Sequence, residues 1–344
     1  MQKILVQSGI PRYYFDRLQK QSIQLVEFPN DAAKARLVFT KHANTEALLI
    51  RANFQITRNE LDCLPHLKRV GLVSTGSDLI DTPLLNERSI QLTTGEGANA
   101  RAVFDYVIHA LFEFWQNIPQ TLHQGVGIIG KGRIGSLLCE YFSRCGIPHA
   151  AFDPFVLPMA NLSETLNFPI VSFHVPLSTG QWGTRQMLNA NYFDVQKKFP
   201  LHIINTSRGQ IFDPQFYRSL RQNSRIKLWA QDVFPEEPPL NSAIHQSVFS
   251  TPHIAGYSTQ GRLGGLRRCL KTFFPEIDFS DSPLSAPWSL RYESMQLKIR
   301  GSFNARRDTY PWRKEFQEYT KIEKAWFRQI YRKIPQNFVD NLFR

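Results

Sequence analysis

Residues 125–138, GVGIIGKGRIGSLL, decide the fold of this chain. The run VGII at 126–129 is typical of a short buried strand, and the amphipathic segment from residue 133 onward is typical of a helix. Between them three glycines form the pattern G-x-G-x-x-G, at Gly130, Gly132 and Gly135. In a nucleotide-binding unit the first glycine permits a tight turn, the second lets a pyrophosphate approach the backbone, and the third lets helix and strand pack closely. The stretch therefore predicts a strand, a phosphate-binding turn and a helix.

A carboxylate that binds the ribose is expected about 20 residues after the first glycine of such a turn. Asp153 occupies that place, at the end of the run HAAFDP. The next residues, Pro154 and Phe155, carry no positive charge to neutralise a 2′-phosphate, and a carboxylate would repel one. The sequence thus predicts NAD rather than NADP, with the phosphates facing the helix start at Arg133 and Ile134.

The rest of the chain alternates strand and helix patterns, as a parallel α/β sheet requires. The first part contains the candidate strands KILV, ALLIRA and RVGLVS. Segment 99–117 has apolar residues at helical spacing and predicts a long helix, with Val103, Val107, Leu111 and Phe114 on its packing face. Further candidate strands follow the glycine turn: HAAFDP, PIVSFHVP, LHIINTSRG, IKLWAQDVF and VFSTPHIAG. The predicted fold class is α/β, with a doubly wound parallel sheet.

Composition narrows the class of protein further. Of 344 residues 42% are hydrophobic and 20% charged, which is usual for a globular protein, and no apolar run approaches the ~18 residues of a membrane span. The four cysteines show neither metal-binding spacing nor a disulfide framework, so we expect no metal and a reducing, cytoplasmic location. More than half of the net charge of +12 lies in residues 285–344. Because the aromatic residues of that tail fall at helical spacing, we expect it to pack against a partner subunit rather than to bind nucleic acid.

Residues suited to acid–base chemistry follow three of the later strands. Arg208 ends IINTSRG, Asp232 and Glu237 lie in WAQDVFPEEP, and His253 lies in STPHIAGY. Ligands of doubly wound sheets bind at the carboxyl ends of the strands. Oxidation of an alcohol needs a base, for which His is suited near neutral pH, and the fork of an Arg binds both oxygens of a carboxylate. The pattern predicts hydride transfer between a hydroxy acid and the cofactor.

The motifs GIIGKGRIG, HVPL, INTSRGQIFD, DVFPEEP and TPHIAG resemble, in order, those of the D-isomer-specific 2-hydroxyacid dehydrogenases. The resemblance extends over residues 5–264. It implies that Arg208 binds the substrate carboxylate, that His253 is the acid–base group and that Glu237 supports His253. Glu236 stands beside Glu237, and the assignment between the two is open. His174 in SFHVPL is expected to have a structural or cofactor-lining role.

A narrower resemblance is to the enzymes of this family that oxidise 4-phospho-D-erythronate in pyridoxal phosphate biosynthesis. It rests on the stretches ALLIRANFQIT, GLVSTGSDLID, GEGANARAVFDYV and TPHIAGYSTQGRLGG. It implies further cofactor contacts at Val175, Thr206, Ser207, Asp232 and Gly256. It implies substrate contacts at Arg51, Ala52, Ser74 and Tyr257. Ala52 and Val175 stand where these enzymes usually have a hydroxyl and a Thr, and the short segment 154–169 predicts a trimmed crossover helix.

By the same resemblance the chain comprises three domains. A flavodoxin-like substrate domain is expected over residues 1–94 and 254–280, a Rossmann NAD-binding domain over 95–253, and a small α+β dimerisation domain over 285–344. The expected partners are a small phosphorylated hydroxy acid and a second copy of the chain. Two alternatives are open: another 2-hydroxy acid as substrate, such as glycerate or hydroxypyruvate, and an NAD-sensing binding protein without catalysis.

Overall fold

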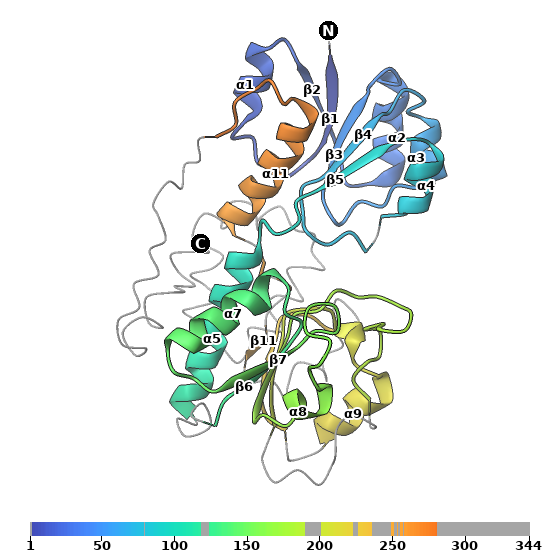
Figure 1. Cartoon of the computed structure of the whole chain (residues 1–344). Helices are drawn as coiled ribbons and strands as arrows, with labels where there is room; N and C mark the ends of the chain where they lie inside the picture. The colour runs from blue at the N-terminus through green and yellow to red at the C-terminus, as the bar shows by residue number, and fades with distance from the viewer. Residues whose placement is uncertain are drawn as a thin grey trace, which may run out of the picture. The chain divides into compact units, whose positions relative to one another are not determined.

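The computed structural model of the chain has two compact units, each built on a parallel sheet (Figure 1). It describes residues 2–78, 80–117, 124–189, 201–222, 226–235, 249–250, 253, 255–256 and 258–280. The chain passes from the first unit to the second between Asn99 and Ala100, and it returns between Gly256 and Tyr257. The predicted dimerisation domain lies outside the described residues.

The sheet of the first unit has the strand order β2-β1-β3-β4-β5, with every neighbouring pair parallel. Its strands are β1 (Lys3–Gln7), β2 (Gln24–Phe28), β3 (Ala47–Ile50), β4 (Arg69–Leu72) and β5 (Gln91–Thr94). Its helices are α1 (Phe15–Lys20), α2 (Ala32–Lys41), α3 (Arg58–Asp62), α4 (Thr82–Glu87) and α11 (Thr259–Phe273). Helices α1 and α11 cover one face of the sheet, and α2, α3 and α4 cover the other (Figure 1).

Helix α11 comes from the far end of the described chain and completes the first unit. Its apolar residues Leu266, Cys269 and Leu270 are fully buried in the core of that unit. Glycines let the helix approach the strands closely: a Cβ at Gly265 would lie 2.0 Å from the carbonyl oxygen of Val73. Residues 258–280 therefore pack with the N-terminal part of the chain.

The second unit contains a six-stranded parallel sheet with the order β11-β10-β9-β8-β6-β7. Its strands are β6 (Val126–Ile129), β7 (His149–Phe152), β8 (Ile170–Phe173), β9 (Leu201–Asn205), β10 (Ile226–Gln231) and β11 (Phe249–Ser250). Its helices are α5 (Ala100–Asn117), α7 (Arg133–Arg144), α8 (Leu162–Leu166), the 3₁₀ turn η1 (Gly209–Ile211) and α9 (Pro214–Gln222). The chain runs from β6 outward to β7 and then back to β8 on the other side of β6. This reversal creates a topological switch point between β6 and β8, where doubly wound sheets bind ligands.

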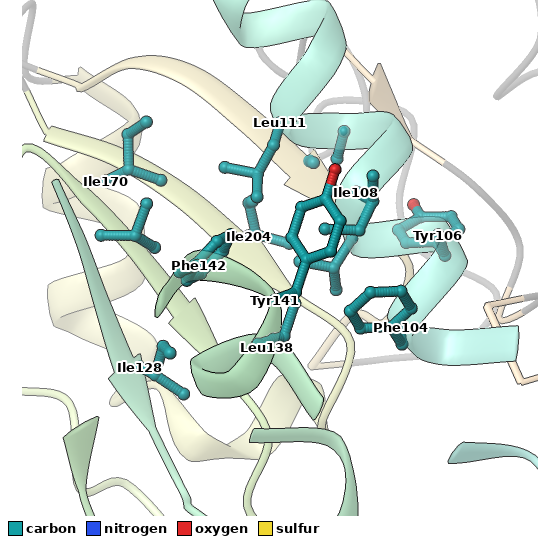
Figure 2. Close-up of a cluster of buried hydrophobic side chains, with 14 of the residues drawn as sticks. Phe104, Tyr106, Ile108, Leu111, Ile128, Leu138, Tyr141, Phe142, Ile170 and Ile204 are labelled. Carbon is teal, nitrogen blue, oxygen red and sulfur yellow. The ribbon is translucent and has the colours of Figure 1, made fainter. Parts of the chain in front are cut away.

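Alternate residues of these strands feed two apolar cores, one on each face of the sheet. On one face, residues of α5 and α7 pack against Ile128, Ile170 and Ile204 of the sheet (Figure 2). Phe104 of α5 meets Tyr141 of α7 edge to face, with 5.5 Å between ring centroids. On the other face, the neighbouring strand residues pack against α8 and α9, among them Ile129, Val171 and Ile203. Burial on both faces explains why these strands read as continuous apolar runs.

The crossover from β7 to β8 is short, as the length of residues 154–169 predicts. It contains only the five-residue helix α8, capped by Asn161, whose side chain accepts from the backbone of Ser163. Within the described ranges, no helix has the length and apolar character needed to cross a membrane.

Candidate functional site

The glycine turn has the geometry that its sequence predicts. Gly130 adopts φ +94°, and a Cβ there would lie 2.5 Å from the carbonyl oxygen of His174. At Gly135 a Cβ would lie 2.0 Å from the carbonyl oxygen of Gly130, so this glycine lets α7 pack on the end of β6. At Gly132, the N-cap of α7, no heavy atom of the described residues lies within 4 Å of the Cβ position. The turn is therefore closed where helix and strand meet and open where a phosphate would approach the backbone.

Asp153 lies beside this turn, immediately after β7. Its Oδ2 accepts a hydrogen bond from the backbone N–H of Lys131 at 2.8 Å, and its Oδ1 accepts from that of Phe155 at 3.1 Å. These bonds fix the carboxylate next to the loop in which Gly132 lies. A fixed negative charge at this place suits the ribose hydroxyls of NAD and disfavours the extra phosphate of NADP.

The ends of β8 and β9 contribute a cluster of polar groups at the switch point. The ring of His174 lies between two hydroxyls, with Nε2 2.8 Å from Ser172 Oγ and Nδ1 3.1 Å from Thr206 Oγ1. The backbone N–H of Val175 donates to Ser207 Oγ at 3.0 Å. Burial lowers the pKa of His174 to about 3, so the imidazole is neutral near pH 7. His174 is thus a neutral group hydrogen-bonded to two hydroxyls, and its structural or cofactor-lining role stays a prediction.

The predicted carboxylate ligand Arg208 follows β9 in a tightly supported loop. Asn205, fully buried, accepts from the backbone N–H of Ser207 at 3.0 Å and donates to the carbonyl oxygen of Arg208 at 3.2 Å. A Cβ at Gly209 would lie 1.8 Å from the carbonyl carbon of Phe234, so only glycine lets this loop lie against the chain that leaves β10. The guanidinium of Arg208 donates to the carbonyl oxygen of Ser207 at 2.8 Å.

The predicted acid–base group His253 is held by Asp232, the residue after β10. The backbone N–H of His253 donates to the carbonyl oxygen of Asp232 at 2.8 Å, and that of Ala255 donates to Asp232 Oδ2 at 2.8 Å. Asp232 is 1% exposed, whereas the side chain of His253 is exposed. His253 has φ +56°, in the left-handed region that few non-glycine residues adopt. The hydrogen bonds of Asp232 thus help to hold the backbone of His253 in this conformation, with the imidazole exposed.

Other predicted site residues lie elsewhere or outside the described residues. Glu237 and Tyr257 are not described, and Gly256 directly precedes the return to the first unit. Arg51, Ala52 and Ser74 belong to the first unit, and their contact with substrate stays a prediction.

Within that unit, Arg51 and Ser74 follow the carboxyl ends of β3 and β4. The backbone N–H of Arg51 donates to Gln7 Oε1 at 2.6 Å, and its Nη1 lies 2.7 Å from where a Cβ of Gly9 would be. Ser74 Oγ is buried without a hydrogen-bond partner among the described residues. A buried hydroxyl in that state is suited to receive a ligand group.

Asn205 is a site residue that carries no recognisable catalytic chemistry of its own. In the sequence, Asn205 is an amide side chain at the end of an apolar strand and directly precedes residues with predicted roles. Because a buried amide needs hydrogen-bond partners, this position could have indicated a supporting residue.

Comparison with known proteins identifies the class to which this fold and site belong. The profile of the D-isomer specific 2-hydroxyacid dehydrogenase NAD binding domain matches residues 113–255, which contain the glycine turn, Asp153, Arg208 and His253. Residues 113–255 therefore form an NAD-binding domain of the D-isomer-specific 2-hydroxyacid dehydrogenase type, and the chain is an enzyme that uses NAD. The predicted family, fold class and cofactor are confirmed.

Within that family the chain is similar to erythronate-4-phosphate dehydrogenases. The enzyme of Tolumonas auensis is 28% identical over 319 residues, covering 81% of this chain and 85% of its own length. That of Pseudoalteromonas atlantica is 30% identical over 251 residues, covering 69% and 66%, and that of Bacteroides fragilis is 27% identical over 328 residues, covering 89% and 90%.

Solved structures share the fold at lower identity. The NADPH-dependent glyoxylate/hydroxypyruvate reductase of Sinorhizobium meliloti matches with a TM-score of 0.65 at 20% identity, covering 80% of this chain and 94% of its own. The NAD⁺-bound 3-phosphoglycerate dehydrogenase of Entamoeba histolytica matches with a TM-score of 0.63 at 19% identity, covering 82% and 99%.

Proposed function

We propose that this chain oxidises 4-phospho-D-erythronate to 2-oxo-3-hydroxy-4-phosphobutanoate. The hydrogen bonds that tie the Arg208 loop to β9 and the His253 loop to the end of β10 support the proposal most directly. They hold a carboxylate ligand and a base at the carboxyl edge of one nucleotide-binding sheet. The similarity to erythronate-4-phosphate dehydrogenases supports the choice of substrate.

In the proposed mechanism, the guanidinium of Arg208 binds the substrate carboxylate through two parallel hydrogen bonds and so fixes the neighbouring C2. The imidazole of His253 removes the proton of the C2 hydroxyl, and the electrons of that O–H bond form the carbonyl as hydride leaves C2. Bound NAD supplies the hydride acceptor. Glu237 accepts a hydrogen bond from the other ring nitrogen of His253 and stabilises its protonated form.

The test is NADH formation by the purified protein, followed at 340 nm, with 4-phospho-D-erythronate beside D-glycerate. A 2-oxo acid is added in parallel reactions so that a tightly held reduced cofactor is reoxidised. We expect saturable turnover of the phosphorylated acid, and loss of that turnover in His253→Ala. The matched control is His66→Ala, because His66 is an exposed histidine of the first unit.

Arg208→Lys separates the role of charge from that of geometry. Lysine keeps the positive charge but lacks the planar fork, so KM for the hydroxy acid should rise while NAD affinity stays unchanged. Full activity in both His253→Ala and Arg208→Lys would refute the proposed site.

Ala52 favours one second candidate, an unphosphorylated 2-hydroxy acid. Its side chain is exposed and offers no hydroxyl after β3, where the resemblance leads one to expect a substrate hydrogen bond. The same assay decides: saturation by D-glycerate, without saturation by the phosphorylated acid, would replace the proposed substrate.

The pathway and the assembly are parts of the same proposal. The product would enter the biosynthesis of pyridoxal phosphate in the cytoplasm, and residues 285–344 would join two copies of the chain. The assembly is tested by light scattering as the protein elutes from a gel-filtration column. The expected molar mass is twice the chain mass of 39.8 kDa.

A further inference from the structure

Two buried polar residues lie side by side beneath the proposed reacting groups. Asn205 is the last residue of β9, and Asp232 directly follows the adjacent strand β10. The backbone N–H of Asp232 donates to the carbonyl oxygen of Asn205 at 3.0 Å. Their exposures are 0% and 1%, so each side chain is placed where an unpaired polar group would be costly.

Each of the two residues forms two hydrogen bonds with the backbone of one reacting loop. The amide of Asn205 binds the backbone of Ser207 and of Arg208, on either side of the peptide that leads into the arginine. The carboxylate of Asp232 binds the N–H of Ala255, and its carbonyl oxygen binds that of His253. Asp232 therefore binds the chain at His253 and again two residues later. His253 has φ +56°, an unfavourable backbone conformation that persists only when the surrounding structure holds it.

We propose that Asn205 and Asp232 are a pair of positioning residues, which set the carboxylate ligand and the base of the reaction relative to one another. Asn205 positions Arg208, and Asp232 positions His253. The two residues are joined by a backbone hydrogen bond at the ends of adjacent strands. The loops of Arg208 and His253 are therefore both fixed to the same part of the sheet. This role of Asp232 is additional to the cofactor contact that the sequence predicts for it, and it rests on the proposed function.

The two halves of the pair should fail in different ways. Asn205→Ala removes both loop bonds, and Asn205→Asp keeps the acceptor for Ser207 while losing the donor to Arg208. Both variants should raise KM for 4-phospho-D-erythronate, because a displaced Arg208 binds the carboxylate less well. Asp232→Ala should instead lower kcat and move the acid limb of the kcat–pH profile, because the base is displaced. A misplacement near 1 Å corresponds to an effect of about 10–100-fold.

Asp232→Asn distinguishes support of the loop from a need for charge. An amide oxygen can accept from the N–H of Ala255, so in this variant the acid limb of the kcat–pH profile should lie closer to its wild-type position than in Asp232→Ala. The matched control is Gln231→Ala, a buried polar neighbour whose side chain binds Tyr217 rather than a reacting loop. It should lower the melting temperature while leaving KM and the pH profile unchanged.

Hydrogen exchange supplies a readout that needs no substrate. The amide of Ala255 should exchange faster in Asp232→Ala than in Asp232→Asn, and that of Ser207 should exchange faster in Asn205→Ala than in Asn205→Asp. Affinity for NAD, measured by calorimetry, should change less than twofold in both Asn205 variants.

Unchanged KM in Asn205→Asp would overturn the proposal, as would loss of activity in Asp232→Asn with NAD affinity reduced and amide exchange unaltered. The latter result would make Asp232 a cofactor ligand only. Failure of the proposed function looks different: His253→Ala would then remain active, while the exchange measurements would still decide whether the two loops are held as described.

Discussion

Replacing Gly135 and Gly132 by Ala separates the two tasks of the glycine turn. A Cβ at position 135 would lie 2.0 Å from the carbonyl oxygen of Gly130, whereas real Cβ contacts essentially never fall below 3.0 Å. Helix α7 must therefore move away from β6, which disturbs the core formed by Leu138, Tyr141 and Phe142. Overpacking of this kind costs about 1–3 kcal/mol of unfolding free energy, which corresponds to a melting temperature lower by roughly 2–12 °C.

Gly132→Ala should leave folding nearly unchanged. The added Cβ meets no heavy atom of the described residues within 4 Å, and Gly132 has φ −72°, which alanine adopts without strain. We expect a change of less than about 1 kcal/mol in stability. The same methyl group stands where the pyrophosphate must approach the backbone, so NAD affinity should fall about tenfold or more, or ~1.4 kcal/mol.

Thermal unfolding with and without NAD measures both effects on the same samples. At an NAD concentration of about 100 times Kd, binding stabilises the wild type by about 2.7 kcal/mol, and a tenfold weaker site gains only about 1.4 kcal/mol. Gly135→Ala should melt early without NAD, and Gly132→Ala should melt normally without NAD but gain less from it. The reasoning fails if Gly135→Ala melts like the wild type, or if Gly132→Ala binds NAD with wild-type affinity.

Three further expectations concern titratable groups. The pKa of His174 is lowered by burial to about 3, against 6.5 when unfolded, so the unfolded chain takes up the proton first and stability falls as pH drops from 6.5 towards 3. At pH 5 the loss is about 2 kcal/mol, and urea unfolding at pH 7 and pH 5 should show a smaller difference in His174→Gln. Burial raises the pKa of Cys269 to about 12, so iodoacetamide at pH 8 should leave Cys269 unlabelled in the native protein; labelling without denaturant would contradict this. Glu60→Gln should cost about 1–2 kcal/mol in urea unfolding, because Glu60 caps α3 with Thr57 and pairs with Arg36 at 2.6 Å; an unchanged midpoint would contradict it.

The parts of the fold that local chemistry dictates were predictable from the sequence. The glycine turn, the helix over 100–117 and the strand ends at Asp153 and Arg208 each combine a strong apolar pattern with a residue that only one local geometry suits. Strands β2 (QLVEF) and β5 (QLTT) were not singled out, because each lies at an edge of its sheet and leaves most of its side chains only partly buried. An edge strand needs fewer apolar residues, and its sequence pattern is correspondingly weak.

The hydrogen bonds that hold the loops of the candidate site could not be predicted from the sequence in the same way. Arg208 and His253 carry recognisable chemistry, but the hydrogen bonds of Asn205 and Asp232 to their loops depend on which backbone N–H and C=O groups the fold leaves unpaired. Which of these groups are unpaired depends on three segments, those after β9, after β10 and around His253. They are more than twenty residues apart in the sequence and meet at one edge of the sheet. A sequence pattern records the residue types at that edge and not their pairing.

The short crossover between β7 and β8 bears on which parts of a doubly wound sheet are needed to bind a nucleotide. The segment from β7 to β8 is reduced to one short helix, and its side chains Phe155 and Met159 are 78% and 96% exposed. The short crossover carries α8 over β6 and β7, where its Leu166 packs in the core on one face of the sheet, whereas the switch point lies at the strand ends between β6 and β8. The glycine turn, the Asp153 carboxylate and the two loops of Arg208 and His253 all follow the carboxyl ends of strands. A short crossover therefore leaves the cofactor-binding strand ends in place, because β6, β8, β9 and β10 are paired with one another in register.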